Sequence, residues 1–334
     1  MAGKVLKELP ALRFASGERF TPMGALKAVA DYLGVDASYP WLMGMSGAAF
    51  RSSWSDTWSM DMTYAAPEDL VANGARALGL QAESYVDLPP EEAWSNLVER
   101  LDASLPVLSC GLAGAPEFCV VYGYRDDPQR LLVRSYFAKD EGEVPFHPWI
   151  GWNYAGYGRN PLVLLKPGEE ERPALEEALR RVLRFARGEG PLAPQLESKG
   201  LRTGLASYQG WIAALQEDAE EDLESRAFNM ALNLNALVDA RRTASEFTQI
   251  LAAMNEDWRS SLGRAADHYR HQVTALGEAR RILYFPREAP EEAATKAARQ
   301  LADPELRKRY TEVLRAAHEE ESLSLEWIER AVKA

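Results

Sequence analysis

The stretch Glu117-Phe118-Cys119-Val120-Val121-Tyr122-Gly123-Tyr124 does most to decide the fold of this chain. A short apolar run rich in β-branched and aromatic residues, bounded by turn residues, is typical of a buried strand. Gly114 and Pro116 come before the run, and the charged turn Arg125-Asp126-Asp127 follows it. We therefore predict a buried strand between two turns. Similar runs predict further buried strands at 106–110, 131–133 and 161–165.

Helices are expected before these strands. Thr21 and Pro22 have the residue types of an N-cap and a first helical residue, and Gly34 has that of a C-cap. Further helices are predicted to begin at Pro67 and Pro90. Because these helices precede the strands and do not alternate with them, we predict an α+β fold for this half of the chain.

The composition changes near residue 167. The sequence beyond it is rich in Ala, Glu, Arg and Leu at helical spacing, which predicts an all-α helical bundle. We expect an α+β domain at 1–167, a bridging helix and linker at 168–200, and a helical domain at 201–334. The helices expected in that last domain span 208–217, 225–254, 258–284, 291–301, 304–318 and 323–332.

Composition argues against several functions. The net charge of -12 disfavours a general nucleic-acid surface, which needs clustered Lys and Arg in excess. No apolar run of signal-peptide or membrane-spanning length occurs, so we expect a cytoplasmic protein that does not insert into membranes. The four histidines and two cysteines form no standard zinc motif. We predict no metal and no cofactor.

Four short motifs carry a resemblance to a known family. They are Asp31-Tyr32-Leu33-Gly34, Ala77-Leu78-Gly79, Leu105-Pro106-Val107 and Val120-Val121-Tyr122-Gly123-Tyr124. In order and spacing they resemble the papain-like domain shared by double-glycine leader peptidases and butirosin biosynthesis protein H. The latter is an acyltransferase that moves an aminoacyl group from a carrier protein to an aminoglycoside. The resemblance covers roughly residues 15–165, and it implies a papain-like fold.

The resemblance also implies positions for a Cys-His-Asp triad. The cysteine position falls at Thr21 or its neighbours Pro22 and Met23, the histidine position at Glu117, and the acid position near Ser135. None of these residues matches the triad. We therefore expect a peptidase-like pseudoenzyme that binds a small-molecule or peptide ligand in the former catalytic cleft. For Thr21 itself we favour a helix cap over a nucleophile.

An alternative retains catalysis. Cys119 lies two residues after Glu117, so on a strand both side chains project to the same face, and Glu117 could serve as base for amide hydrolysis or acyl transfer. We favour the simpler interpretation, in which Cys119 is a small buried hydrophobic residue. A third hypothesis is a protein-interaction scaffold. Whether the protein is an enzyme, and whether it forms a homodimer, stays open.

Several other residues are candidates for ligand binding. If the two loops that carry them converge, aromatic residues and an acid would form a pocket for a cationic or sugar-amine ligand, although packing in a core is the favoured interpretation: Trp54, Asp56, Trp58, Trp149, Trp152 and Tyr154. Ser46 lies in a sequence close to a nucleophile elbow, for which we favour a close-packed turn.

Two pairs in the helical half complete the candidates. Asn229 and Asn233 share one face of an apolar helix, where structural hydrogen bonds are favoured over ligand contacts. His268 and His271 lie three residues apart, and without a third ligand at readable spacing we expect a solvent-facing pair.

Overall fold

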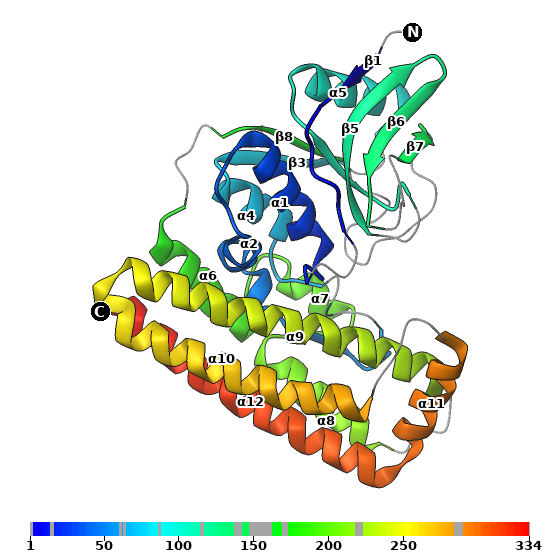
Figure 1. Cartoon of the computed structure of the whole chain (residues 1–334). Coiled ribbons are helices and arrows are strands. Elements are labelled where there is room, and N and C mark those ends of the chain that lie inside the picture. The colour runs from blue at the N-terminus through cyan, green and yellow to red at the C-terminus, as the bar shows by residue number, and fades with distance from the viewer. Residues whose placement is uncertain are drawn as a thin grey trace. The chain divides into compact units, whose positions relative to one another are not determined.

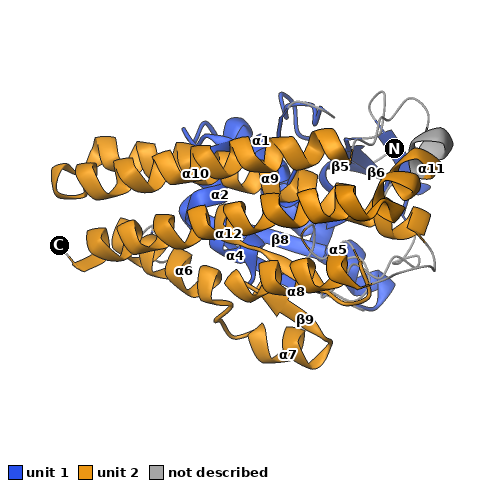
Figure 2. Cartoon of the chain, turned by 90° about the horizontal axis from the view of Figure 1, so that it is seen from below, with its two compact units in different colours: residues 1–46, 69–173 blue, residues 47–68, 174–334 orange. Residues whose placement is uncertain are grey.

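Figure 1 shows a computed structural model of the chain. The residues that it describes are 3–13, 17–59, 62, 65–85, 88–113, 117–136, 142–146, 162–168, 173–217, 223–283 and 290–333, with the backbone alone for 290–294. The chain forms two compact units, coloured in Figure 2. Unit 1 comprises Met1–Ser46 and Asp69–Pro173, and unit 2 comprises Gly47–Glu68 and Ala174–Ala334.

Unit 1 has the predicted α+β character. Its sheet is seven-stranded and antiparallel, in the order β3-β8-β4-β5-β6-β7, with β1 paired to β5. The elements in chain order are β1 (Gly3–Val5), α1 (Thr21–Leu33), α2 (Tyr39–Ser46), α4 (Leu70–Ala77), β3 (Leu80–Tyr85), α5 (Pro90–Asp102), β4 (Val107–Cys110), β5 (Phe118–Asp126), β6 (Gln129–Arg134), β7 (Gly142–Pro145) and β8 (Leu162–Pro167).

Helix α1 packs against β5, the strand with which the sequence analysis began. The helix buries Met23, Leu26 and Val29 completely, as its apolar spacing requires. It ends at Gly34, which has a φ of 68° and donates its backbone N–H back to the last turn, as a glycine C-cap does. The packing brings the N-terminus of α1 to the first residues of β5.

Unit 2 is mainly helical. Its elements are η1 (Ala48–Phe50), β2 (Ser53–Ser55), α6 (Leu175–Arg187), α7 (Ala193–Ser198), β9 (Leu201–Thr203), α8 (Leu205–Gln216), α9 (Leu223–Met254), α10 (Glu256–Ile282), α11 (Pro290–Ala302) and α12 (Pro304–Lys333). Among the described residues, no helix is both long and apolar enough to span a membrane.

One helical prediction was wrong. Two helices were expected at 304–318 and 323–332, but α12 continues through Glu319-Glu320-Glu321-Ser322. The Glu321 carboxylate in this segment is buried and accepts hydrogen bonds from Arg241, Tyr208 and Gln272. These partners come from three other helices, so nothing local in the sequence marks the run as helical interior.

The segment 47–68 was expected in the α+β domain but packs within unit 2. Its strand β2 pairs with β9, and the Arg241 guanidinium donates to the backbone carbonyls of Ala49 (2.7 Å) and Arg51 (3.0 Å). Phe50 makes edge contacts with Phe247 and Tyr269. Partners more than a hundred residues away in the sequence therefore set the position of this segment.

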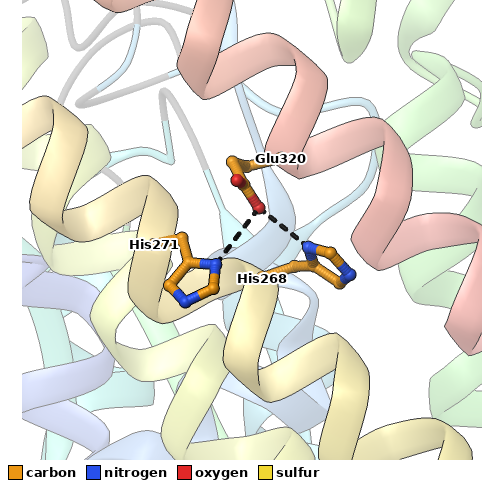
Figure 3. Close-up of side chains that lie close together, drawn as sticks. All are labelled: His268, His271 and Glu320. Carbon is orange, nitrogen blue, oxygen red and sulfur yellow. Dashed lines mark hydrogen bonds and ion pairs between the residues drawn. The ribbon is translucent and has the colours of Figure 1, made fainter.

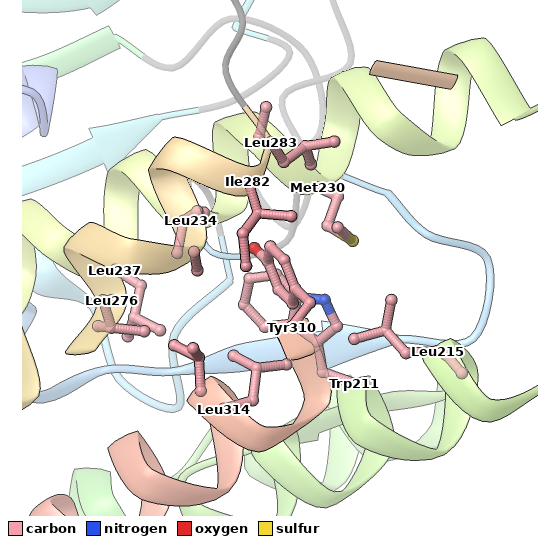
Figure 4. Packing of buried hydrophobic residues seen from close by; sticks show 14 of the residues in the cluster. Trp211, Leu215, Met230, Leu234, Leu237, Leu276, Ile282, Leu283, Tyr310 and Leu314 are labelled. Atoms are coloured by element: carbon pink, nitrogen blue, oxygen red, sulfur yellow. The ribbon is translucent and has the colours of Figure 1, made fainter. Parts of the chain in front are cut away.

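The core of unit 2 is built around aromatic residues. Trp54 is fully buried and stacks on Trp211, with ring centroids 4.8 Å apart and planes 8° apart. Trp211 in turn contacts Tyr310 of α12 at 6.2 Å between centroids. Figure 4 shows leucines of α8, α9, α10 and α12 around the rings of Trp211 and Tyr310. Apolar burial on this scale is the main force that holds the helices together.

Candidate functional site

The N-terminus of α1 is bonded directly to the start of β5. Thr21 Oγ1 donates a hydrogen bond of 2.6 Å to a carboxylate oxygen of Glu117. The same hydroxyl oxygen accepts a 3.2 Å hydrogen bond from the backbone N–H of Phe118. One side chain thus joins two segments that are 96 residues apart in sequence. These are two of the three positions that the sequence analysis singled out.

The expected role of Thr21 as a helix cap was wrong. Phe20 occupies the N-cap position, where no side chain caps the helix, and Thr21 is the first helical residue. The N–H groups of Met23 and Gly24, which a Thr21 cap would bond, both donate to the Phe20 carbonyl at 3.1 Å. The Thr21 hydroxyl is therefore available to Glu117, because the cap that it was expected to supply is not made.

Three further residues at this helix terminus were missed by the sequence analysis. A Cβ added to Gly24, one turn into α1, would lie 1.8 Å from Tyr136 Oη and 3.5 Å from a Glu18 carboxylate oxygen. Gly24 thus lets the tyrosine hydroxyl reach the helix backbone. A glycine in the first turn of a predicted helix is a sequence signal for close approach. This signal does not indicate which residue lies against the glycine.

The electrostatics of the site favour negative charge beside the helix. The N-terminus of a helix carries a partial positive charge, which stabilises a nearby carboxylate. Glu117 and Glu18 are both half-buried there, whereas Thr21 is only 7% exposed. A carboxylate can accept a proton from a threonine hydroxyl only with difficulty, because the basicities of the two groups are far apart. The pair is better suited to accepting a hydrogen bond from a ligand than to generating a nucleophile.

Cys119 is not placed for thiol chemistry in the folded chain. Its side chain is 1% exposed, and its thiol donates to the backbone carbonyl of Ser109 at 3.4 Å. Burial raises the pKa of Cys119 to about 12. Burial likewise raises the pKa of Cys110, with smaller contributions from Cys119 and Glu117. Neither thiol forms an appreciable amount of thiolate at neutral pH, and thiolate is the nucleophilic form.

Ser135, at the position implied for the triad acid, is buried and donates to the backbone carbonyl of Ala113 at 3.0 Å. Ser46 is fully buried at the end of α2, and its hydroxyl donates to the Met43 carbonyl at 3.2 Å. This placement agrees with the close-packed turn favoured for Ser46. Both hydroxyls donate to backbone carbonyls.

The aromatic candidates that the structure describes lie in unit 2, in the segment 47–68. Trp54 and Trp58 are 0% and 5% exposed, and their rings meet edge to face at 5.3 Å. They belong to the core, so packing accounts for them better than the expected ligand pocket. Asp56 is exposed and pairs with Arg202 at 3.3 Å. Trp149, Trp152 and Tyr154 lie outside the described residues.

The two asparagines of α9 differ in burial. Asn233 is fully buried, accepts a hydrogen bond from the Met62 N–H at 3.1 Å, and donates to the Ser59 carbonyl at 2.8 Å. Its amide therefore holds the segment 47–68 in place, as the favoured structural interpretation requires. Asn229 is half-buried one turn earlier.

Comparison with known proteins adds no further constraint. No family model matches the chain, and no curated protein or solved structure is significantly similar to it.

Proposed function

We propose that unit 1 is a papain-like domain that binds a small, amine-bearing or otherwise cationic ligand beside Thr21 and Glu117, in place of thiol hydrolysis. The observation that carries this proposal is the 2.6 Å hydrogen bond between Thr21 and Glu117. It joins the two positions at which the resemblance implies a nucleophile and its base. A hydroxyl and a carboxylate occupy them.

The chemistry of these two groups supports binding over catalysis. An ionised carboxylate only accepts hydrogen bonds and has two oxygens with which to accept them, so a donor on a ligand is the kind of group that Glu117 can bind. It lacks the ability of imidazole to take up and return a proton near neutral pH. The buried Cys119 offers no substitute nucleophile.

Charge supports the choice of ligand class. Glu117 and Glu18 both lie near the first turn of α1, and a hydrogen bond to an ionised group is about twice as strong as one between neutral groups. An ammonium group would be attracted by both carboxylates. A neutral amide of the same shape would lose this charge interaction.

The test compares matched pairs of small ligands by thermal denaturation of the full chain. Each pair is an amine, such as an amino sugar or an amino acid amide, and its N-acetylated form. We expect the amine to raise the melting temperature of the wild type and its acetylated partner to have little effect. In Glu117→Gln, which keeps the shape of the side chain and removes its charge, the amine should lose its effect.

Two outcomes would overturn the proposal. One is equal stabilisation of wild type and Glu117→Gln by every amine that binds. The other is turnover of amide, ester or thioester substrates that depends on Glu117, because turnover would make the site catalytic. Glu8→Gln serves as the control, since Glu8 is exposed and carries the same charge on unit 1.

A further inference from the structure

His268, His271 and Glu320 come together on the surface of unit 2 (Figure 3). His268 and His271 lie one turn apart on α10, and Glu320 lies on α12. A carboxylate oxygen of Glu320 is 2.8 Å from His268 Nδ1 and 3.7 Å from His271 Nδ1. One ligand atom from each residue lies within 4.8 Å of the other two. The two histidines were identified from the sequence. The third ligand, Glu320, was not, because it lies 49 residues beyond His271 in the chain.

Hydrogen bonds join α10 and α12 on both sides of the cluster. On one side, Gln272 Nε2, adjacent to His271, donates to the Ala317 carbonyl at 2.8 Å. On the other side, Ser324 Oγ lies 3.4 Å from the Ala265 carbonyl. The backbones that carry the three side chains are therefore fixed relative to each other. Because the two helices are already packed against each other, an ion that binds here does not have to order them.

The donor set is that of a transition-metal site. Two imidazole nitrogens and one carboxylate oxygen are typical ligands of zinc and of other divalent first-row metals, and open sites of this kind complete their coordination with water. Ligand atoms about 2.1 Å from a tetrahedral zinc ion lie about 3.4 Å from one another. The two separations from Glu320, 2.8 and 3.7 Å, lie on either side of this value, and all three ligand atoms lie within 4.8 Å of one another.

An ion has access to the cluster. The side chains of His268 and Glu320 are 24% and 26% exposed, and that of His271 is 67% exposed. His271 also lines an open groove whose walls include Glu278 and Glu312. Water can therefore reach the outer side of a bound ion.

We propose that His268, His271 and Glu320 bind one divalent transition-metal ion, zinc by preference, with water as the remaining ligand. Zinc has no geometric preference from d-electrons, which suits a site whose positions are set by two packed helices. A bound ion links α10 to α12 and stabilises unit 2, because it binds the folded chain and not the separated helices. This inference rests on unit 2 alone and is independent of the function proposed for unit 1.

The test is isothermal titration of the chelator-treated full chain with zinc chloride. We expect one zinc ion per chain and a higher melting temperature with zinc present. Magnesium should bind far more weakly, because it prefers oxygen ligands. His268→Ala, His271→Ala and Glu320→Gln should each weaken zinc binding at least about tenfold, since losing a residue that only orients a ligand already costs about 10–100-fold.

Glu319→Gln is the matched control. Glu319 is the exposed neighbour of Glu320 on the same helix, so its replacement changes the charge by the same amount and should leave zinc affinity within about twofold of wild type. His271→Ala separates loss of zinc binding from loss of folding. Its side chain is largely exposed, so its removal should not change the melting temperature measured without zinc.

Cobalt gives a second readout. Co²⁺ bound by the wild type should show the visible absorption of a four- or five-coordinate ion, and this absorption should be lost in His271→Ala. Absence of stoichiometric zinc binding would overturn the proposal. So would zinc binding that is equally strong in the three ligand variants, because the ion would then be bound elsewhere.

Discussion

The hydroxyl of Tyr136 occupies the space that a Cβ atom would need at Gly24. Such a Cβ would lie 1.8 Å from Tyr136 Oη and 3.1 Å from Cζ, the ring carbon that carries the hydroxyl. Both residues are buried. Gly24 in the first turn of α1 and Tyr136 after β6 are therefore fitted to each other, next to the Thr21–Glu117 hydrogen bond.

The first prediction concerns this contact. Gly24→Ala should destabilise unit 1 by about 1–3 kcal/mol, because overpacking forces the tyrosine or the helix to move. Tyr136→Phe removes the atom that clashes, so the double variant should lose less stability than the sum of the single losses. Urea denaturation of the four proteins measures this coupling. Strict additivity would show that the two residues do not meet.

The second prediction concerns the Thr21 hydroxyl. Thr21→Val removes a donor to Glu117 and an acceptor for the Phe118 N–H, and losing a hydrogen bond to a charged group costs about 1.5–3 kcal/mol. Thr21→Ser keeps the hydroxyl and loses one methyl group, so it should be the more stable of the two variants. Chemical denaturation measures the difference. A valine variant as stable as the serine variant would mean that the hydrogen bonds contribute nothing.

The third prediction concerns alkaline pH. The folded chain holds the Cys119 proton up to about pH 12, whereas an unfolded thiol loses it near 9.0. The unfolded state therefore binds fewer protons between these values, and stability falls as pH rises from about 9 towards 12, on the order of 1 kcal/mol per pH unit. Below about pH 9 the thiol is protonated in both the folded and the unfolded state, so it does not make the free energy of unfolding depend on pH. Denaturation of wild type and Cys119→Ala across this range should give a shallower decline in the variant.

Alkylation checks the same thiol independently. Iodoacetamide should leave Cys119 unmodified in the native chain at neutral pH and modify it after denaturation, since only an accessible thiolate reacts. Rapid labelling of the native protein at Cys119 would contradict both the burial and the raised pKa. It would also revive the alternative in which Cys119 acts with Glu117.

The fourth prediction concerns the buried ion pair of unit 2. Arg241 and Glu321 are 0% and 2% exposed in their side chains. Replacing one partner, in Arg241→Met or Glu321→Leu, should cost about 3–5 kcal/mol, because the other charge stays buried without compensation. The double variant should lose less than the sum of the two, as measured by thermal or urea unfolding. Glu319→Gln, an exposed change on the same helix, should stay within about 0.5 kcal/mol of wild type.

Local sequence patterns determined most of the secondary structure. Apolar periodicity and the residues Pro22, Gly34 and Pro90 were sufficient to place α1 and α5 to within a residue or two, because these signals act over one or two turns of a helix. Short β-branched runs located β4, β5, β6 and β8 in the same way. From this order of elements the α+β character followed.

Only the tertiary structure decided which distant side chains meet. Thr21 was expected to cap its own helix but bonds to Glu117, and Trp54 was expected near a ligand but stacks on Trp211. The histidines of α10 lie beside Glu320, which α12 carries between the two helices that the sequence predicted. A pairing between residues far apart in the chain depends on how whole elements pack, and packing is driven by non-directional burial of apolar surface. The pattern along one segment therefore shows which face is buried, but not which residue it meets.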